Sequence, residues 1–333
     1  LVLKFLFLVL LLYSCTQPKV LQLEESYFTF TVESGLKKTQ LCVFETSKYP
    51  ECRVQLIPDK LWKCRYIHED KPFLGLSSKE FSSILISEIS DFNLKFPKYS
   101  SVEKKILFIP KEGLPEEKGF ESNLYSHLSK VKISIKMEQP VLGEFGIFLR
   151  KSIEADADSS PDIFYSGDRW NETLEKGRFQ SNNFSFSPEE YYDKLSSSKE
   201  FSPCRQSLSR LFTDTQSGAE KFAACTKVLE DKLNFSRASQ DTTVAYGEFW
   251  KSFRDNLKSN SLEESVLLFS ASQFCSVSAD QLQRQGFGKN LSKRFCYTLA
   301  YANAMLKESG SKKIELLPQE SFSKGVLLKS LCR

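Results

Sequence analysis

The sequence predicts an α+β protein, with an N-terminal antiparallel β-sandwich followed by a C-terminal helical bundle. Short apolar–polar alternations lie in residues 21–153, helix-start signals and helical spacing lie in residues 187–333, and residues 154–186 show neither pattern. Strand signals followed by helix signals are typical of the α+β class. We therefore divide the chain into a β-sandwich domain, a loop or linker, and a mainly helical domain.

The strand signal of residues 21–153 is an alternation with a period of two. Phe28, Phe30 and Val32 alternate with threonines, and residues 131–138 alternate in the same way. Such a strand has one buried face and one solvent-exposed face. Turn signals separate further short apolar runs at residues 41–44, 53–57, 84–89, 106–109 and 146–149. About seven short strands without long helices between them predict an antiparallel sandwich.

Two short motifs in this region are similar to those of a known family. Residues 84–89 read Ile-Leu-Ile-Ser-Glu-Ile, and residues 121–126 read Glu-Ser-Asn-Leu-Tyr-Ser. The first resembles the opening strand of lamin-tail-like domains, and the second is a degenerate form of the strand that follows it. This resemblance covers about residues 80–165. It implies an immunoglobulin-like sandwich.

Capping boxes mark the predicted helix starts of residues 187–333. A Glu or Gln follows three residues after each of Ser187, Ser217, Ser261 and Ser278. This pairing satisfies backbone amides that the first helical turn leaves free. The apolar residues behind these starts have the three- and four-residue spacing of a helix face. Short polar connections favour antiparallel helices packed as a bundle.

Residues 1–14 have the pattern of a signal peptide. One positive charge, Lys4, precedes an unbroken apolar run at residues 5–12. Eight helical residues rise only about 12 Å, far less than the roughly 30 Å of a bilayer core. The segment is therefore predicted to be an export signal and not a transmembrane helix.

The motif that follows is Leu12-Tyr13-Ser14-Cys15. It resembles the lipobox of bacterial lipoproteins, in the relaxed form of spirochaetes. The resemblance implies cleavage before Cys15, a diacylglycerol thioether on Cys15, and residues 15–20 as a lipidated tether. We expect a cell-envelope protein whose lipid holds it to the outer membrane, on the surface or on the periplasmic face. An ordinary secretory signal with an incidental cysteine is the alternative.

The cysteine count permits disulfides. Nine cysteines are present, and eight remain without Cys15, an even number in a chain predicted to be exported. Cys204 and Cys225 are 21 residues apart, as are Cys275 and Cys296. The equal spacing predicts one disulfide in each of two helical units. Buried free thiols with a coincidental spacing are the alternative.

An acidic loop is the best candidate for a metal site. Oxygen-bearing side chains alternate there, at Asp156, Asp158, Ser160 and Asp162. This order resembles the start of an EF-hand calcium loop, but Pro161 replaces the required glycine and Gly167 replaces the closing glutamate. Calcium is thus the one candidate cofactor. A solvated acidic loop without a cofactor is the alternative.

Catalytic motifs are absent from the sequence: it contains no GxSxG, P-loop, GxGxxG or HExxH pattern. The formal net charge of +4 is spread along the chain, which argues against a nucleic-acid partner.

Trp170, next to Arg169 in a polar segment, is a candidate exposed contact residue. The alternative is that the Trp170 side chain folds back onto the sandwich.

These features predict a non-enzymatic binding or structural protein of the envelope, with a protein or matrix ligand. The prediction rests on the missing catalytic motifs and on a fold class often used for binding. The alternative is an envelope hydrolase or carbohydrate-acting enzyme. Its carboxylates would converge only in three dimensions.

Overall fold

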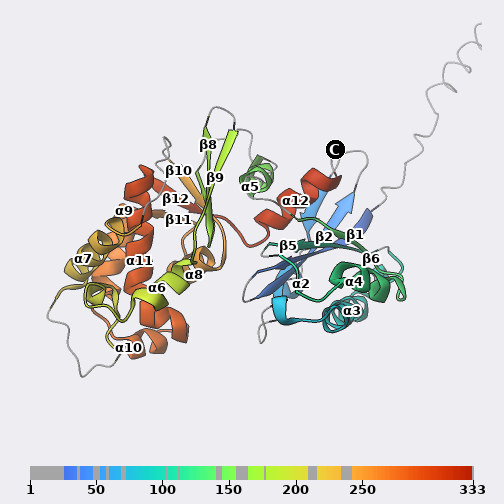
Figure 1. The fold of residues 1–333 in the computed structure, drawn as a ribbon, viewed down its shortest axis with the longest axis horizontal. Helices are drawn as coiled ribbons and strands as arrows, with labels where there is room; N and C mark the ends of the chain where they lie inside the picture. Colours follow the sequence, from blue (N-terminus) through green and yellow to red (C-terminus); the bar gives the residue numbers. More distant parts are fainter. Residues whose placement is uncertain are drawn as a thin grey trace, which may run out of the picture. The chain divides into compact units, whose positions relative to one another are not determined.

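The chain forms two compact units, residues 1–137 with 330–333 and residues 138–329. The structure is a computed structural model. It describes residues 26–35, 38–47, 53–57, 60–68, 73–102, 104–111, 113–139, 145–154, 164–175, 178–208, 216–233 and 242–331. Each unit is built on one mixed sheet with helices packed on it (Figure 1). The predicted N-terminal sandwich and C-terminal helical bundle are therefore both wrong.

The sheet of unit 1 has the strand order β3-β2-β1-β5-β6, and β4 also pairs with β2. β2 is antiparallel to β1, β3 and β4, whereas β1, β5 and β6 run parallel. The strands are β1 (Ser26–Ser34), β2 (Thr39–Ser47), β3 (Arg53–Leu56), β4 (Cys64–His68), β5 (Lys104–Pro110) and β6 (Ser134–Met137). The alternation that predicts β1 is confirmed, but the parallel pairing of β1 with β5 excludes a purely antiparallel sandwich.

Two helices cover one face of this sheet, α3 (Ser78–Lys95) and α4 (Phe120–Ser129). Alternate residues of β1 pack against them and form the core of unit 1. This core includes Phe28, Phe30, Val32, Leu41, Val43, Phe81, Leu85, Ile89, Phe92, Ile106, Phe108, Phe120, Leu124 and Leu128. Short helical segments are α2 (Lys60–Lys63), η1 (Phe73–Gly75) and η2 (Pro97–Tyr99).

The two motifs that resemble a lamin-tail-like domain are both helical. Residues 84–89 lie inside α3, and residues 121–126 lie inside α4. The buried side chains of α3 recur at intervals of three and four residues, as a helix face requires. A capping box at Ser77 and Glu80 starts the helix. The resemblance is therefore wrong, and so is the strand predicted at residues 146–149, which lie in α5 (Phe145–Glu154).

The sheet of unit 2 has the order β11-β12-β10-β7-β8-β9. β7, β10 and β12 are parallel, and the other neighbours are antiparallel. The strands are β7 (Phe164–Ser166), β8 (Trp170–Glu175), β9 (Arg178–Asn183), β10 (Thr242–Ala245), β11 (Ser261–Glu263) and β12 (Lys313–Leu316). Residues 154–186, predicted as a linker, thus supply three strands of the second sheet.

The two sheets share one topology. In each, three consecutive strands form an antiparallel meander. The first of them pairs in parallel with a later strand, which pairs in parallel with a still later one. The path β3-β2-β1-β5-β6 of unit 1 corresponds to β9-β8-β7-β10-β12 of unit 2. The fold is therefore an internal structural duplication.

Residues 187–333, predicted as a helical bundle, form helices that connect or follow the strands of the unit 2 sheet. Together with α5 (Phe145–Glu154), which precedes β7, the described helical segments of unit 2 are α6 (Pro188–Leu195), η3 (Ser202–Cys204), α7 (Gly218–Glu230), α8 (Glu248–Leu257), α9 (Glu264–Phe274), α10 (Ala279–Arg284), α11 (Lys289–Ser309) and α12 (Ser321–Leu331). The capping boxes predicted at Ser187, Ser217 and Ser278 are confirmed. The one predicted at Ser261 is wrong, because this residue lies in β11.

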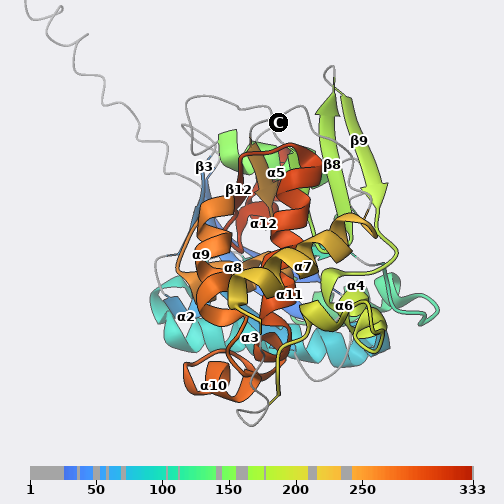
Figure 2. The same cartoon turned by 90° about the vertical axis from the view of Figure 1, so that its left-hand side faces the viewer.

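Helices α7, α9 and α11 pack together with β10 and β12 around the main core of unit 2. Helices α5 and α12 lie side by side (Figures 1 and 2). Gly325 permits their close approach, because a Cβ atom there would lie 1.7 Å from the carbonyl oxygen of Phe148. The helical segments are thus integral to an α/β unit.

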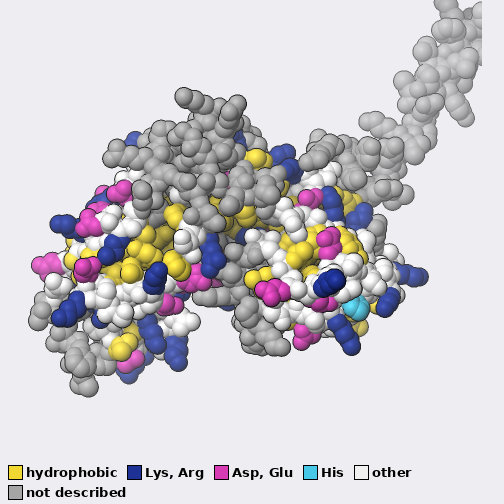
Figure 3. Space-filling view, viewed as in Figure 1, with side chains coloured by type: hydrophobic (Ala, Val, Ile, Leu, Met, Phe, Trp, Pro, Cys, Tyr) yellow, Lys and Arg dark blue, Asp and Glu magenta, His cyan; other side chains and the backbone are white. Residues whose placement is uncertain are grey.

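Acidic and basic side chains are interspersed on the face of each unit that Figure 3 shows. Within the described ranges, no helix combines the length and the apolar character needed to cross a bilayer.

Candidate functional site

The carboxyl ends of parallel strands form the edge where open α/β sheets usually bind ligands. In unit 1 this edge is formed by the ends of β1 and β5. The backbone amide of Lys111, just after β5, donates to the carbonyl of Ser34 at the end of β1, at 3.2 Å. The Lys111 ammonium lies 3.2 Å from a carboxylate oxygen of Glu33. The edge therefore holds a fixed pair of opposite charges.

Glu33 is a buried acid, since its side chain is only 3% exposed, and the Lys111 side chain is 19% exposed. A carboxylate that is removed from water needs a charged or hydrogen-bonding partner, which Lys111 supplies. Gln40 lies directly opposite Glu33 on β2. Its side-chain amide donates to the sulfur of Cys42 at 3.0 Å. The surroundings of this carboxylate are thus fixed by two strands and a loop.

Two hydroxyl groups lie at the same end of the hairpin but on the other face. Ser34 and Thr39 are paired in register and are buried, and neither hydroxyl has a hydrogen-bond partner in the described part of the chain. Because side chains alternate along a strand, Ser34 faces the side that α3 and α4 cover, whereas Glu33 faces away from it. We therefore assign the hydroxyls no role beside Glu33.

The corresponding edge of unit 2 also carries an acidic residue, but its carboxylate binds backbone amides and not a lysine. A Ser-Gly pair ends the first strand of each meander, Ser34-Gly35 in unit 1 and Ser166-Gly167 in unit 2. Asp168 follows, and its two carboxylate oxygens accept the backbone amides of Glu248 at 3.0 Å and Phe249 at 3.2 Å. These amides start α8, so the acid of this edge occupies a helix N-terminus.

The charge of Asp168 also acts on the core behind it. Burial raises the pKa of Tyr301 far above its usual range, and repulsion from Asp168 raises it further. Tyr301 therefore stays neutral throughout the physiological range.

Trp170 and Arg169 do not form the exposed contact that the sequence predicts. Trp170 is 8% exposed and stacks on Phe145, with 4.7 Å between the ring centres. Arg169 donates two hydrogen bonds to the Glu190 carboxylate, at 2.9 and 2.8 Å. Burial opposes ionisation of Glu190, but hydrogen bonds from the Ser187 amide and from Arg169 outweigh it and lower the pKa of Glu190. Trp170 is thus buried in unit 2, and Arg169, whose side chain is 28% exposed, is held by an ion pair.

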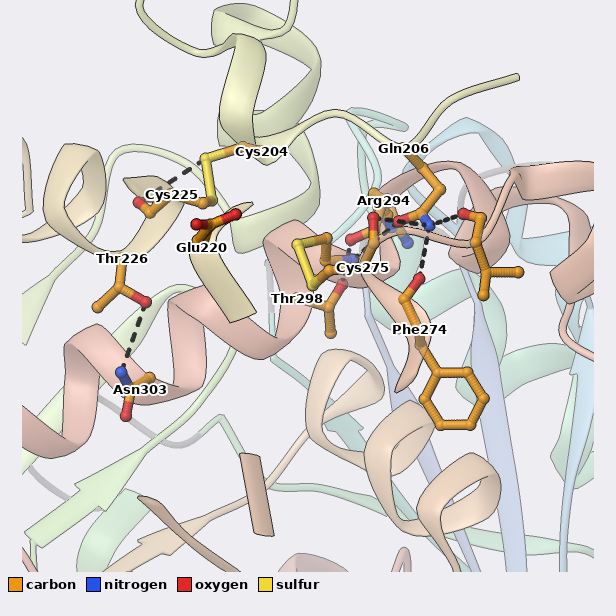
Figure 4. The surroundings of a disulfide bond; sticks show 12 residues. Cys204, Gln206, Glu220, Cys225, Thr226, Phe274, Cys275, Arg294, Thr298 and Asn303 are labelled. Atoms are coloured by element: carbon orange, nitrogen blue, oxygen red, sulfur yellow. Dashed lines mark hydrogen bonds between the residues drawn. A yellow bond between two sulfur atoms is a disulfide. The ribbon is translucent and has the colours of Figure 1, made fainter. Parts of the chain in front are cut away.

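The structure places the four cysteines singled out by their spacing in two disulfides, Cys204–Cys225 and Cys275–Cys296. Gln206, two residues after Cys204 in the chain, forms hydrogen bonds beside the Cys275–Cys296 disulfide (Figure 4). Its side-chain amide donates to the carbonyl of Phe274 at 2.8 Å, and its side-chain oxygen accepts the amide of Cys296 at 3.3 Å. A further disulfide, Cys42–Cys64, joins neighbouring strands of unit 1.

The other predicted site residues lie outside the described residues. These are Cys15 and the candidate calcium loop Asp156, Asp158, Ser160 and Asp162. Among the residues that are described, no group of three or more His, Cys, Asp or Glu side chains is arranged to hold a metal ion.

The sequence did not single out the Glu33–Lys111 pair, whose members are 78 residues apart. The pair forms only because β1 and β5 are parallel neighbours. One signal was available. Glu33 follows the apolar residues of β1, and Lys111 follows those of β5. Charged residues at such positions are functional candidates once the strands are known to be parallel.

Solved structures share this fold. The chain resembles a Ppx/GppA family member from Aquifex aeolicus, with a TM-score of 0.58, 12% identity, and coverage of 92% of this chain and 98% of that one. It also resembles an exopolyphosphatase from Cytophaga hutchinsonii, with a TM-score of 0.54, 10% identity, and coverage of 92% and 98%. No protein-family model matches the sequence, and no curated protein matches it.

At these identities the likeness concerns the fold alone, which contains two α/β units of related sheet topology. It overturns the prediction of a non-enzymatic binding or structural protein, because the sandwich on which that prediction depended is absent and the proteins that share the fold include enzymes. The hydrolase alternative fits the finding better than the binding protein does. The chain therefore has the fold of the Ppx/GppA structures.

Proposed function

We propose that this chain is a phosphatase-type enzyme that hydrolyses phosphoanhydride or phosphoester bonds at the unit 1 edge. The observation that carries the proposal is the buried Glu33 carboxylate paired with Lys111 at the carboxyl ends of β1 and β5. The likeness in fold to a Ppx/GppA family member and an exopolyphosphatase supports phosphate compounds as the substrate class.

In the proposed reaction Lys111 attracts the substrate phosphate and offsets its negative charge. Glu33 accepts a proton from a water molecule as the water oxygen forms a bond to phosphorus. The bond from phosphorus to the leaving oxygen breaks, and an alcohol leaving group takes up a proton from solvent. Inorganic phosphate and the remaining alcohol or phosphate are released, and Glu33 returns its proton to solvent. Lys111 and Glu33 are paired before the substrate binds. When the phosphate binds, attraction between Lys111 and the phosphate replaces part of the attraction between Lys111 and Glu33.

Phosphate release by the purified full chain tests this proposal. We expect release from at least one of an aryl phosphate, ATP and tripolyphosphate, measured with and without Mg²⁺. The rate should scale with protein concentration and follow the protein through two different columns. A rate that stays at the buffer blank for all three substrates would reject the proposal.

We also propose that the enzyme works in the cell envelope, held by lipid on Cys15. The lipobox-like motif supports the anchor, and three disulfides support an oxidising compartment. When the full chain is made in a bacterial host, we expect it to partition into a detergent phase and Cys15→Ser to stay in the aqueous phase. Thr16→Ala, which keeps the cysteine, should behave like the parent. Equal partition of the parent and Cys15→Ser would contradict the anchor.

Calcium binding by the loop of Asp156, Asp158, Ser160 and Asp162 stays a prediction from the sequence, as does a protein or matrix partner. Neither has support from the described residues.

A further inference from the structure

The Cys42–Cys64 disulfide of unit 1 is more exposed than the two disulfides of unit 2. Cys64 is half-buried. The cysteines of the unit 2 disulfides are all fully buried, namely Cys204, Cys225, Cys275 and Cys296. A thiolate must reach a sulfur atom before it can exchange with a disulfide, so exposed disulfides are the labile ones. Among the disulfides of the described ranges, Cys42–Cys64 is therefore the one open to a thiol.

This disulfide joins two neighbouring strands beside the candidate site. Cys42 on β2 lies directly opposite Cys64 on β4. β4 pairs with β2 over four residue pairs, and the register shifts between Thr39 and Gln40. Such an irregularity disrupts the ladder locally and is common next to active sites. Breaking the disulfide therefore weakens the attachment of β4 to β2 next to Gln40.

Gln40 lies between the disulfide and Glu33. Its side-chain nitrogen is 3.0 Å from the sulfur of Cys42 and 3.8 Å from the sulfur of Cys64. Gln40 is also directly opposite Glu33 on β1. Side chains of directly opposite residues share a face of the sheet, with their Cβ atoms about 4.5–5.5 Å apart. The amide of Gln40 is thus within reach of both the two sulfur atoms and the Glu33 carboxylate, and the bonded sulfur atoms accept it in the oxidised protein.

We propose that Cys42–Cys64 is a thiol-exchange site, and that its reduction by a dithiol lowers phosphate release through Gln40. The effect on phosphate release rests on the proposed function. One thiolate of the dithiol attacks the Cys64 sulfur, so a mixed disulfide forms and Cys42 leaves as a thiolate. The second thiolate of the dithiol attacks the dithiol sulfur of the mixed disulfide and releases Cys64. The dithiol is oxidised to a disulfide, and its two protons pass to Cys42 and Cys64.

Reduction changes the hydrogen bonds of the Gln40 amide. The two sulfur atoms move apart once they are no longer bonded, and each thiol is itself a weak donor. The Gln40 amide then donates to the stronger acceptor within its reach, the Glu33 carboxylate. A carboxylate that accepts this hydrogen bond takes a proton from water less readily. We therefore expect reduction to lower kcat about tenfold, the size of effect that one hydrogen bond to a charged group can have.

Thiol labelling tests the exchange site without any need for activity. The full chain is treated with dithiothreitol under native conditions, desalted in acid and alkylated with N-ethylmaleimide in denaturant. Mass mapping then shows which cysteines had been reduced. We expect label on Cys42 and Cys64, while the two disulfides of unit 2 stay intact and the reduced protein stays folded. The exchange site is overturned if all three disulfides are reduced equally, if Cys42 and Cys64 stay unlabelled, or if reduction unfolds the protein.

Phosphate release before and after dithiothreitol tests the role of Gln40. In the parent, reduction should lower kcat about tenfold, and reoxidation should restore it. Gln40→Leu has a similar size but no amide, so its kcat should be the same in both redox states. Gln40→Met takes its place if Gln40→Leu does not fold. Gln55→Leu is the matched control, because Gln55 lies opposite Glu45 in the same sheet but is exposed, and it should respond to reduction as the parent does.

The outcomes separate this inference from the proposed function. If reduction lowers kcat as much in Gln40→Leu as in the parent, loosening of β4 causes the loss and the role of Gln40 is overturned. An active parent with the same kcat in both redox states rejects control by the disulfide and leaves the proposed function standing. A parent that releases no phosphate rejects the proposed function together with that control, and the labelling still decides the exchange site.

Discussion

Replacing Glu33 by glutamine is expected to lower phosphate release by about 10²- to 10⁴-fold, the usual contribution of a general base. Glutamine has nearly the shape of glutamate but cannot accept a proton from water. Because the substitution also removes the carboxylate that competes with phosphate for Lys111, KM should fall while kcat drops. Steady-state kinetics on the substrate that the parent hydrolyses fastest would measure both.

Glu45→Gln is the matched control, since Glu45 lies in the same sheet but is exposed. It should keep the parent rate. The unfolding temperature of each variant separates lost chemistry from lost folding. A folded Glu33→Gln protein with the parent kcat would show that this carboxylate is not the base.

Removing the two disulfides of unit 2 is expected to have the largest effect on stability. Each closes a segment with a separation of 21 residues, and a loop of that length is worth about 3 kcal/mol. The variants Cys204→Ala/Cys225→Ala and Cys275→Ala/Cys296→Ala should each lose about that much, and the combined variant about 6 kcal/mol. Denaturant unfolding under oxidising conditions measures the loss.

Exposed serines near each pair supply the control. Ser202→Ala and Ser276→Ala should change the free energy of unfolding by less than about 0.5 kcal/mol. A combined cysteine variant as stable as the parent would show that these bonds do not hold unit 2 together.

Local patterns in the sequence predicted single elements well. The alternation around Phe30 gave β1, and the capping boxes at Ser187, Ser217 and Ser278 gave three helix starts. The error at residues 84–89 has a physical reason: a short run of Ile and Leu has no clear period, and the helical spacing of α3 is visible only over its full length.

The fold class depends on pairings that no local pattern records. The sandwich was inferred from strands without long helices between them, but α3 lies between β4 and β5 and permits the parallel pairing of β5 with β1. The polar residues 154–186 lack the apolar runs that indicate strands, and yet β7, β8 and β9 within them form a meander. Strand pairing at long range therefore decided the architecture.

The candidate site was hidden for the same reason. Glu33 and Lys111 carry no motif and meet only through the β1–β5 register. Trp170 was misjudged because its polar neighbours suggested exposure, whereas Phe145 from α5 covers its ring. Asp168 is an ordinary acid in sequence, and only the start of α8 gives it a role.

The most direct test of the account is hydrolysis in ¹⁸O-labelled water, with mass analysis of the released phosphate. We expect one solvent oxygen in each phosphate that the parent releases, because water attacks phosphorus, and almost no labelled phosphate from Glu33→Gln. Labelled phosphate formed equally fast by Glu33→Gln, or no phosphate above the blank from the parent, would contradict it.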